Sequence, residues 1–170
     1  MPEYDKTLWD VLKHADLDDS PELSNKERFR ILSIILDVLL FVQTQKCCHL
    51  DLKPSNVLIN LHEGRWDYKH LVLADFGISS RIVSSDDELR VAQMTHAGTP
   101  GFSAPEQFMG NPTIKSDNYS FGKTAVLVLF PWRTAWNLLA YAIKDDDVSP
   151  INNHPLEAVI SNLLQVSTFL

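Results

Sequence analysis

The sequence is short of basic residues, of cysteines and of long hydrophobic runs. Its 15 Lys and Arg are outnumbered by 22 Asp and Glu, and the net charge of −7 leaves no positive field for a nucleic-acid backbone. Cys47 and Cys48 are neighbours, a spacing that disfavours a disulfide or a metal site and is typical of small buried hydrophobes in a reducing cytoplasm. The longest apolar run, residues 31–42, contains Ser33 and Asp37 and is too short to span a bilayer.

The first five residues also lack the basic start and apolar block of a signal peptide. We therefore expect a cytoplasmic protein with no membrane and no nucleic-acid partner. At 170 residues, with 45% hydrophobic and 22% charged residues, the composition is that of one globular domain with a core of its own.

Two capping boxes mark the starts of two helices. Thr7 with Asp10 precedes a short apolar repeat and predicts a helix over residues 8–15. Ser24 with Glu27 begins a longer helix that ends just before His49. Apolar residues occur on almost every side of it, so the sequence predicts that this helix is buried nearly all round. These residues are Phe29, Ile31, Leu32, Ile34, Ile35, Val38, Leu39, Leu40, Phe41 and Val42.

Two short β-branched runs, residues 57–59 and 71–73, predict a β-hairpin. The connection between them, residues 60–70, is long and contains Trp66 and Tyr68. We expect it to be an exposed hairpin tip, with a binding role as the alternative.

Three motifs carry the polar chemistry: HLDLKPSN at residues 49–56, DFG at 75–77 and APE at 104–106. In this order they resemble the catalytic loop, the metal-binding loop and the end of the activation segment of the eukaryotic-type serine/threonine protein kinases. The resemblance extends over nearly the whole chain. It implies a mainly α fold with a small β-hairpin, that of the large, C-terminal lobe of a kinase.

The resemblance also implies roles for residues of the first two motifs, with ATP and Mg²⁺ as cofactors. Asp51 would accept a hydrogen bond from the substrate hydroxyl, and Lys53 would neutralise the γ-phosphate. Asn56 and Asp75 offer the hard oxygen ligands that Mg²⁺ prefers, and Leu58 would contact the nucleotide. The alternative for the polar residues is that they are ordinary loop residues that favour turns.

The other site residues implied by the resemblance position these groups. Thr99, together with the lysine of the catalytic loop, is the serine/threonine pattern and would position a protein substrate. Asp117 would orient the backbone of the catalytic loop, and Glu106 would pair with an Arg near the end of the lobe, for which the sequence shows no match. His49 and Phe76 complete the supporting set.

The family pattern divides the chain into segments. Residues 1–6 resemble the hinge between two lobes, 75–106 the activation segment, and 117–130 the central helix, after which residues 135–144 and 155–166 predict two more amphipathic helices. The polar stretch from Ile78 to His96 is expected to be mobile. Its candidate phosphorylation sites are Ser79, Ser80, Ser84, Ser85 and Thr95, but Leu50 stands where an Arg usually binds an activating phosphate.

A glycine-rich loop, a strand Lys and its partner Glu, which a complete kinase needs above the nucleotide, are not found in the sequence. We therefore expect the large lobe only, with negligible activity alone. An apolar patch that includes Phe76 and Leu58 should face a small lobe or a partner protein. The alternatives are a catalytically inactive, pseudokinase-like binding module and a truncated gene product.

Overall fold

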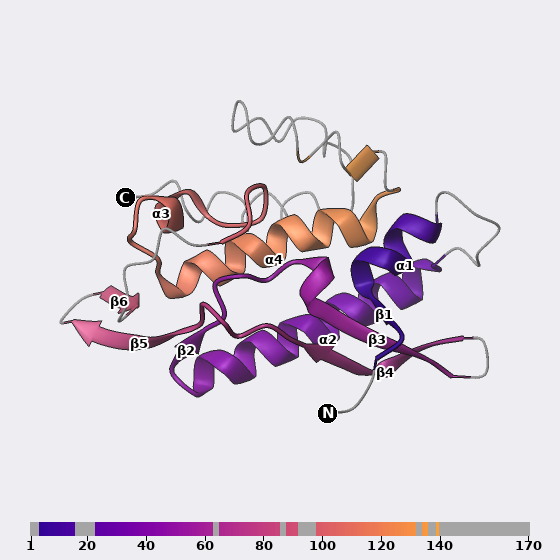
Figure 1. Cartoon of the computed structure of the whole chain (residues 1–170), viewed down its shortest axis with the longest axis horizontal. Coiled ribbons are helices and arrows are strands. Elements are labelled where there is room, and N and C mark those ends of the chain that lie inside the picture. Colours follow the sequence, from indigo (N-terminus) through magenta and orange to yellow (C-terminus); the bar gives the residue numbers. More distant parts are fainter. Residues whose placement is uncertain are drawn as a thin grey trace.

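The structure is a computed structural model that describes residues 4–15, 23–62, 65–85, 88–91, 98–131, 134–135 and 139. Figure 1 shows two small antiparallel sheets beside two long helices. One sheet has the strand order β1-β3-β4, and the other has the order β2-β5-β6. The strands are β1 (Lys6–Thr7), β2 (Cys47–Cys48), β3 (Val57–His62), β4 (Arg65–Leu73), β5 (Ser80–Ser85) and β6 (Glu88–Val91).

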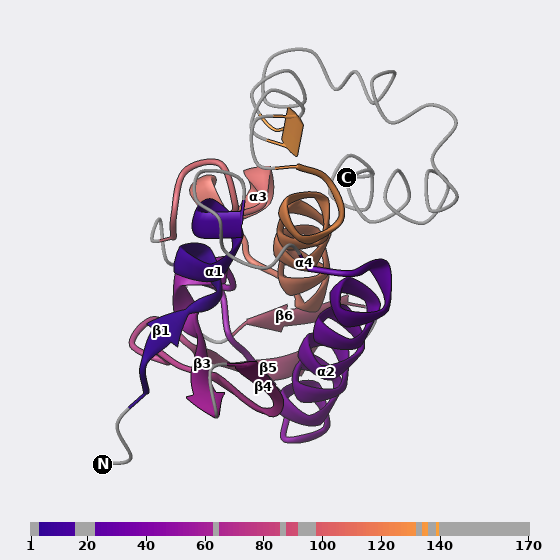
Figure 2. The same ribbon diagram turned by 90° about the vertical axis from the view of Figure 1, so that its right-hand side faces the viewer.

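The helices are α1 (Leu8–Ala15), α2 (Asn25–Thr44), a short 3-10 turn η1 (Pro54–Asn56), α3 (Pro105–Phe108) and α4 (Ile114–Leu129). The main hydrophobic core lies where α2, α4 and the β3–β4 hairpin meet. Figure 2 shows α2 on the outer side of this arrangement, with α4 and the strands on its inner side. No helix among the described residues is long and apolar enough to cross a membrane.

Both predicted capping boxes are present. In the first, the amide of Asp10 donates to Thr7 Oγ1 (3.2 Å) and the amide of Thr7 donates to Asp10 Oδ2 (3.0 Å). The hydrogen bonds with Thr7 lower the pKa of Asp10, because they favour its ionised form. In the second, the amide of Ser24 donates to Glu27 Oε2 at 2.8 Å. The caps therefore start α1 at the predicted residue and α2 next to its predicted cap.

The prediction that the long helix is buried nearly all round is wrong. Its inner side is buried through residues such as Ile31, Ile35 and Leu39. Its outer side carries large apolar side chains that are at least 40% exposed: Phe29, Leu36, Leu40 and Phe41. The sequence shows how many apolar residues a helix has, but not on which sides its neighbours lie.

Two predicted loops are instead strands. The hairpin continues well past residue 59, so most of the expected tip belongs to β3 and β4, and Trp66 packs against the core instead of facing solvent. The start of the expected mobile segment forms β5 and β6, because β5 pairs with β2 (Cys48 opposite Ser80). Of the predicted helices over 135–144 and 155–166, only residues 135 and 139 are described; both are buried.

Arg28 links α2 to the end of α4. Its side chain is buried, and Nη1 donates to the carbonyl of Val128 at 2.5 Å while Nε donates to the carbonyl of Leu23 at 3.0 Å. Val128 lies in the last turn of α4, where carbonyls have no partner within the helix. Arg28 thus ties the two long helices together, a role that its sequence position did not reveal.

Candidate active site

The backbone of residues 49–51 is held by a buried carboxylate at the start of α4. Asp117 Oδ2 accepts from the amide of His49 and Oδ1 from the amide of Leu50, both at 2.7 Å. Burial raises the pKa of Asp117, and the two amide hydrogen bonds oppose that rise because they favour the ionised form. Leu50 needs this support, since its φ of 67° lies in the left-handed region, which is unfavourable for a leucine.

Gln107 holds the carbonyl of Leu50, in the next peptide unit, and sequence reasoning missed it. Its buried side chain donates from Nε2 to the carbonyl of Leu50 at 2.6 Å. Room for this contact depends on Gly98, because a Cβ there would lie 2.7 Å from Gln107 Nε2 and 2.2 Å from Ser103 Oγ. Gly98 also has a φ of 138°, which only glycine adopts readily.

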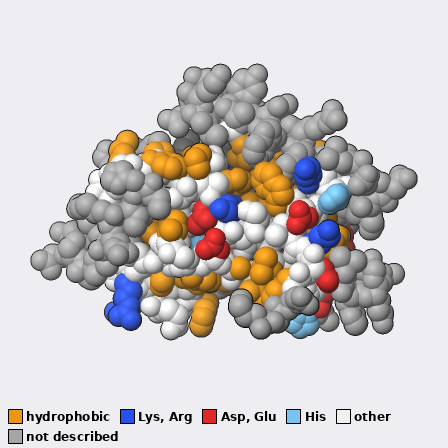
Figure 3. All heavy atoms as spheres, in the orientation of Figure 1, with side chains coloured by type: hydrophobic (Ala, Val, Ile, Leu, Met, Phe, Trp, Pro, Cys, Tyr) orange, Lys and Arg blue, Asp and Glu red, His pale blue; other side chains and the backbone are white. Residues whose placement is uncertain are grey.

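Four of the predicted site residues meet in one hydrogen-bonded cluster. Lys53 Nζ donates to Asp51 Oδ2 (2.7 Å) and to Thr99 Oγ1 (2.6 Å). Thr99 Oγ1 donates to Asp51 Oδ1 at 2.6 Å, and Asn56 Nδ2 donates to Asp51 Oδ2 at 3.1 Å and to its carbonyl at 2.8 Å. Figure 3 shows acidic and basic side chains side by side near the centre of this face. The side chains of Lys53 and Asp51 are 20% and 12% exposed, so solvent reaches the cluster.

Ala74, the residue before Asp75, is hydrogen-bonded through its backbone to Asn56 and His49. The amide of Ala74 donates to the carbonyl of Asn56 at 2.8 Å. His49 Nδ1 accepts from the amide of Asp51 at 3.2 Å, so Nε2 carries the proton and donates to the carbonyl of Ala74 at 3.0 Å. The His49 ring also meets Phe76 edge to face, 4.6 Å between centroids. One histidine thus connects the two motifs.

The side chains of Asn56 and Asp75 offer oxygen donors of the type that magnesium prefers. Asn56 uses its Nδ2 for Asp51, which leaves Oδ1 as a ligand. Asp75 is exposed, with φ 64°, and its Oδ1 accepts from the amide of Gly77 at 3.3 Å. Among the described residues no group of three or more His, Cys, Asp or Glu could hold a metal by itself. Two hard oxygen ligands therefore suit Mg²⁺ completed by water and phosphate oxygens.

The side chain of Leu50 lies in a small apolar cluster. It is fully buried with Cys48, and Ile78, Ile82 and Ile114 pack against the pair. Residues 78 and 82 are thereby fixed to residues 48 and 50 by apolar contacts, at the position where the sequence lacks an Arg.

The candidate phosphorylation sites differ in what the structure says of them. Ser80 is buried, and Ser79 Oγ donates to the carbonyl of His49 at 3.1 Å, so neither side chain is free for modification in this arrangement. Nothing is described for the side chains of Ser84 and Ser85, and Thr95 lies outside the described residues.

The remaining predicted site residues are Glu106, Phe76 and Leu58. Glu106 is buried, and its Oε1 accepts from Ser116 Oγ at 2.7 Å, while Oε2 has no hydrogen bond within the described part of the chain. Phe76 is 46% exposed, as expected for the proposed patch, whereas Leu58 is only partly exposed.

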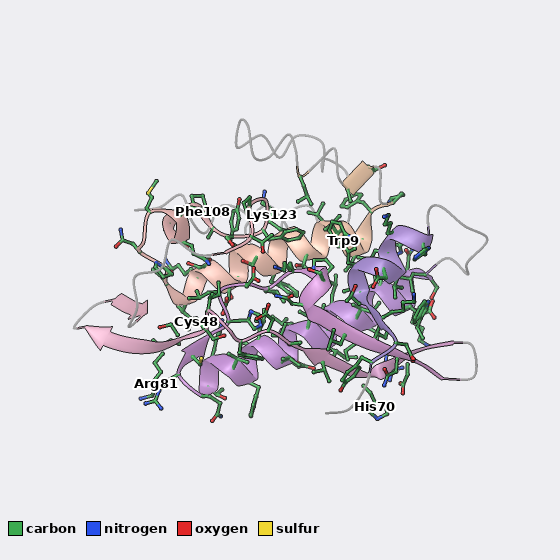
Figure 4. The ribbon with its side chains drawn as sticks, viewed as in Figure 1. Trp9, Cys48, His70, Arg81, Phe108 and Lys123 are labelled. Carbon is green, nitrogen blue, oxygen red and sulfur yellow. The ribbon has the colours of Figure 1, made fainter. Side chains whose placement is uncertain are left out.

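Burial makes Cys48 an unreactive thiol. Its side chain lies between α2 and the start of α4 (Figure 4), and burial raises its pKa to about 12. We expect iodoacetamide at pH 8 to modify no more than one of the two cysteines of the folded protein, and both in urea, because the thiolate is the reactive species. Peptide mapping by mass spectrometry measures this. Modification of Cys48 in the folded protein would contradict it.

Comparison with known proteins identifies the family. The model of the protein kinase domain matches residues 3–148. The chain is 36% identical over 97 residues to serine/threonine-protein kinase C of Synechocystis sp., covering 56% of this chain and 17% of that protein. It is 34% identical over 116 residues to serine/threonine-protein kinase 17A of Oryctolagus cuniculus, covering 68% and 27%.

A solved structure agrees in fold. A chain of the yeast RNA Pol II CTD kinase CTDK-1 complex has a TM-score of 0.58 at 21% identity, covering 74% of this chain and 37% of that one. The chain belongs to the protein kinase family, and its curated relatives place it with the eukaryotic-type serine/threonine kinases. The kinase-like fold class is confirmed, and each match spans less than two thirds of the relative's own length.

Proposed function

We propose that residues 1–170 act as the large lobe of a serine/threonine kinase that transfers the γ-phosphate of ATP to a protein hydroxyl. The observation that carries the proposal is the Asp51 carboxylate, which accepts hydrogen bonds from Lys53, Thr99 and Asn56 within 3.1 Å. This carboxylate already accepts a hydrogen bond from the hydroxyl of Thr99, so it is suited to accept one from a substrate hydroxyl.

Each residue of the cluster has a distinct task in this proposal. Asp51 orients the attacking hydroxyl and takes its proton, while Lys53 places a positive charge where the transferred group gains negative charge. Thr99 holds both side chains and positions the peptide. When bound, ATP supplies the phosphoryl group and Mg²⁺, held by Asn56 and Asp75, neutralises its charge.

A small lobe would have to cover the nucleotide, supplied by another segment of the same protein or by a partner. Phe76, 46% exposed beside Asp75, is the apolar contact point for such a lobe. Because an open cleft admits water and positions phosphates poorly, we propose that residues 1–170 alone have negligible activity. The exposed Phe76 also favours the second candidate, a binding module that uses this surface without catalysis.

Metal binding tests the proposed ligands in the chain itself. Mn²⁺ added with ATP should broaden the backbone amide resonances of Asn56 and Asp75 selectively in NMR spectra. Asp75→Asn should raise the Mn²⁺ concentration needed for this broadening at least about tenfold, because an amide is a poorer ligand than a carboxylate. The matched control is Asp37→Asn, the same change on the exposed side of α2, which should leave the titration unchanged. Broadening that is equal in both variants, or spread over the whole surface, would contradict the site.

A further inference from the structure

The outer side of α2 carries an apolar stripe with no partner among the described residues. Phe29 is 48% exposed, Leu36 40% and Leu40 50%, and Ser33 is exposed between them. Spacings of four, three and four residues place these side chains within about 60° of one another around a helix of 3.6 residues per turn. We call these four residues the α2 stripe. Phe41, 63% exposed, borders it.

The stripe is accessible on the described part of the molecule. Figure 2 shows α2 with α4 and the strands on one side only, and none of the described elements lies beyond its outer side. A stripe at this spacing is the seam by which helices pair in coiled coils and bundles.

Two exposed charges lie along one edge of the stripe. Arg30 and Asp37 are seven residues apart, so they lie on the same side of α2, two turns from each other. That separation, about 10 Å along the helix axis, is too long for an ion pair between them. Neither charge forms an ion pair with another residue of the described part of the chain, so each is available to a group on another molecule.

We propose that a second copy of this chain packs its own α2 stripe antiparallel against the first, about a two-fold axis near residue 34. This register brings Phe29 next to Leu40 of the second copy, and Ser33 next to its Leu36. In an antiparallel two-fold pair, the edges that carry Arg30 and Asp37 lie on the same side of the helix pair. Arg30 then lies opposite Asp37 of the second copy, and Asp37 opposite its Arg30.

The charge pattern selects this arrangement over the parallel one. A two-fold axis parallel to the helices turns the charged edges to opposite sides of the pair, and both charges are then left without partners. The antiparallel pair forms two equivalent ion pairs at the edge of an apolar seam. Its composition, apolar at the centre and charged at the rim, is that of a protein interface.

The size of the contact sets the expected affinity. A helix of 20 residues is about 30 Å long, so two such helices bury less than the roughly 1,600 Å² of a standard interface. We therefore expect a weak dimer, with a dissociation constant on the order of 10 to 100 µM.

Sedimentation equilibrium of the chain, from about 5 to about 500 µM, tests the proposal. The average mass should rise from monomer to dimer over this range. Leu40→Lys should raise the dissociation constant at least about tenfold, because it places two lysines in the seam. Met109→Lys, the same type of change at a side chain that is 71% exposed after α3, is the matched control and should have no effect. Circular dichroism checks that both variants are folded.

A charge-reversal cycle tests the register. Arg30→Asp and Asp37→Arg, each alone, should weaken the dimer about threefold to tenfold at low salt, because like charges then face each other twice. The double variant exchanges the two charges and should restore the dissociation constant of the wild-type dimer. The proposal is overturned if the chain stays monomeric at the highest concentration, if Leu40→Lys leaves a dimer intact, or if the double variant is no better than the single ones. None of these outcomes depends on kinase activity, so the proposed function is tested separately.

Discussion

Asp51→Asn is expected to reduce phosphoryl transfer about 10³-fold in the chain joined to a small lobe. The fold should be unaffected, because asparagine has the same shape and the side chain is not part of the core. In the structure both carboxylate oxygens accept hydrogen bonds, one from Thr99 and one from Lys53 and Asn56. An amide can accept on one side only, so it turns a donor toward one of these groups and has no site for the proton of the substrate hydroxyl.

The small lobe can be that of the Synechocystis kinase, fused before Tyr4. Transfer of labelled phosphate from ATP to a Ser- and Thr-containing peptide measures the rate. Asp37→Asn, on the exposed side of α2, serves as the control and should retain full activity. A folded fusion that binds ATP and Mg²⁺ yet shows no transfer above the Asp51→Asn background would favour the binding module over the enzyme.

The polar site was predictable because its residues lie close together in sequence. Asp51, Lys53 and Asn56 belong to one loop, and the turn of η1 brings Asn56 back to the Asp51 carbonyl at 2.8 Å. Thr99 comes from a distant segment; the sequence pattern named it together with Lys53, and the structure adds the hydrogen bond between them. The roles of these residues remain predictions, whereas their proximity is observed.

The supporting contacts were not predictable from such patterns. Gln107 and Arg28 each donate to a single backbone carbonyl far away in sequence, a contact that places no constraint on neighbouring residues. The left-handed backbone of Leu50 also has no signal, because leucine rarely adopts that conformation. The exposure of Phe29 and Leu40 was missed because a count of apolar residues does not show which sides are covered.

Asp117→Ala is expected to lower the free energy of unfolding by about 3 kcal/mol, because two buried amide groups, those of His49 and Leu50, lose their acceptors. Asp117→Asn keeps one acceptor oxygen and should cost roughly half as much. The loss is smaller than the sum of two charged hydrogen bonds, since burial of the carboxylate already costs free energy, the same cause that raises its pKa. Urea unfolding followed by circular dichroism measures these differences. Lys115→Ala, an exposed change in the same helix turn, should stay within about 0.5 kcal/mol of wild type.

Asp117 also holds Leu50 in its left-handed conformation, so Asp117→Ala should loosen residues 49–51 locally as well as lower the global stability. Without the two acceptors, the φ of 67° at Leu50 is held by the hydrogen bond from Gln107 to the Leu50 carbonyl and by the apolar cluster around its side chain. Hydrogen exchange of the amides of residues 49–51 should therefore accelerate more than that of the inner side of α2, such as Ile35. Equal acceleration in both places would mean that Asp117 contributes to global stability alone, and the loop would then owe its conformation to Gln107 and to the apolar cluster around Leu50.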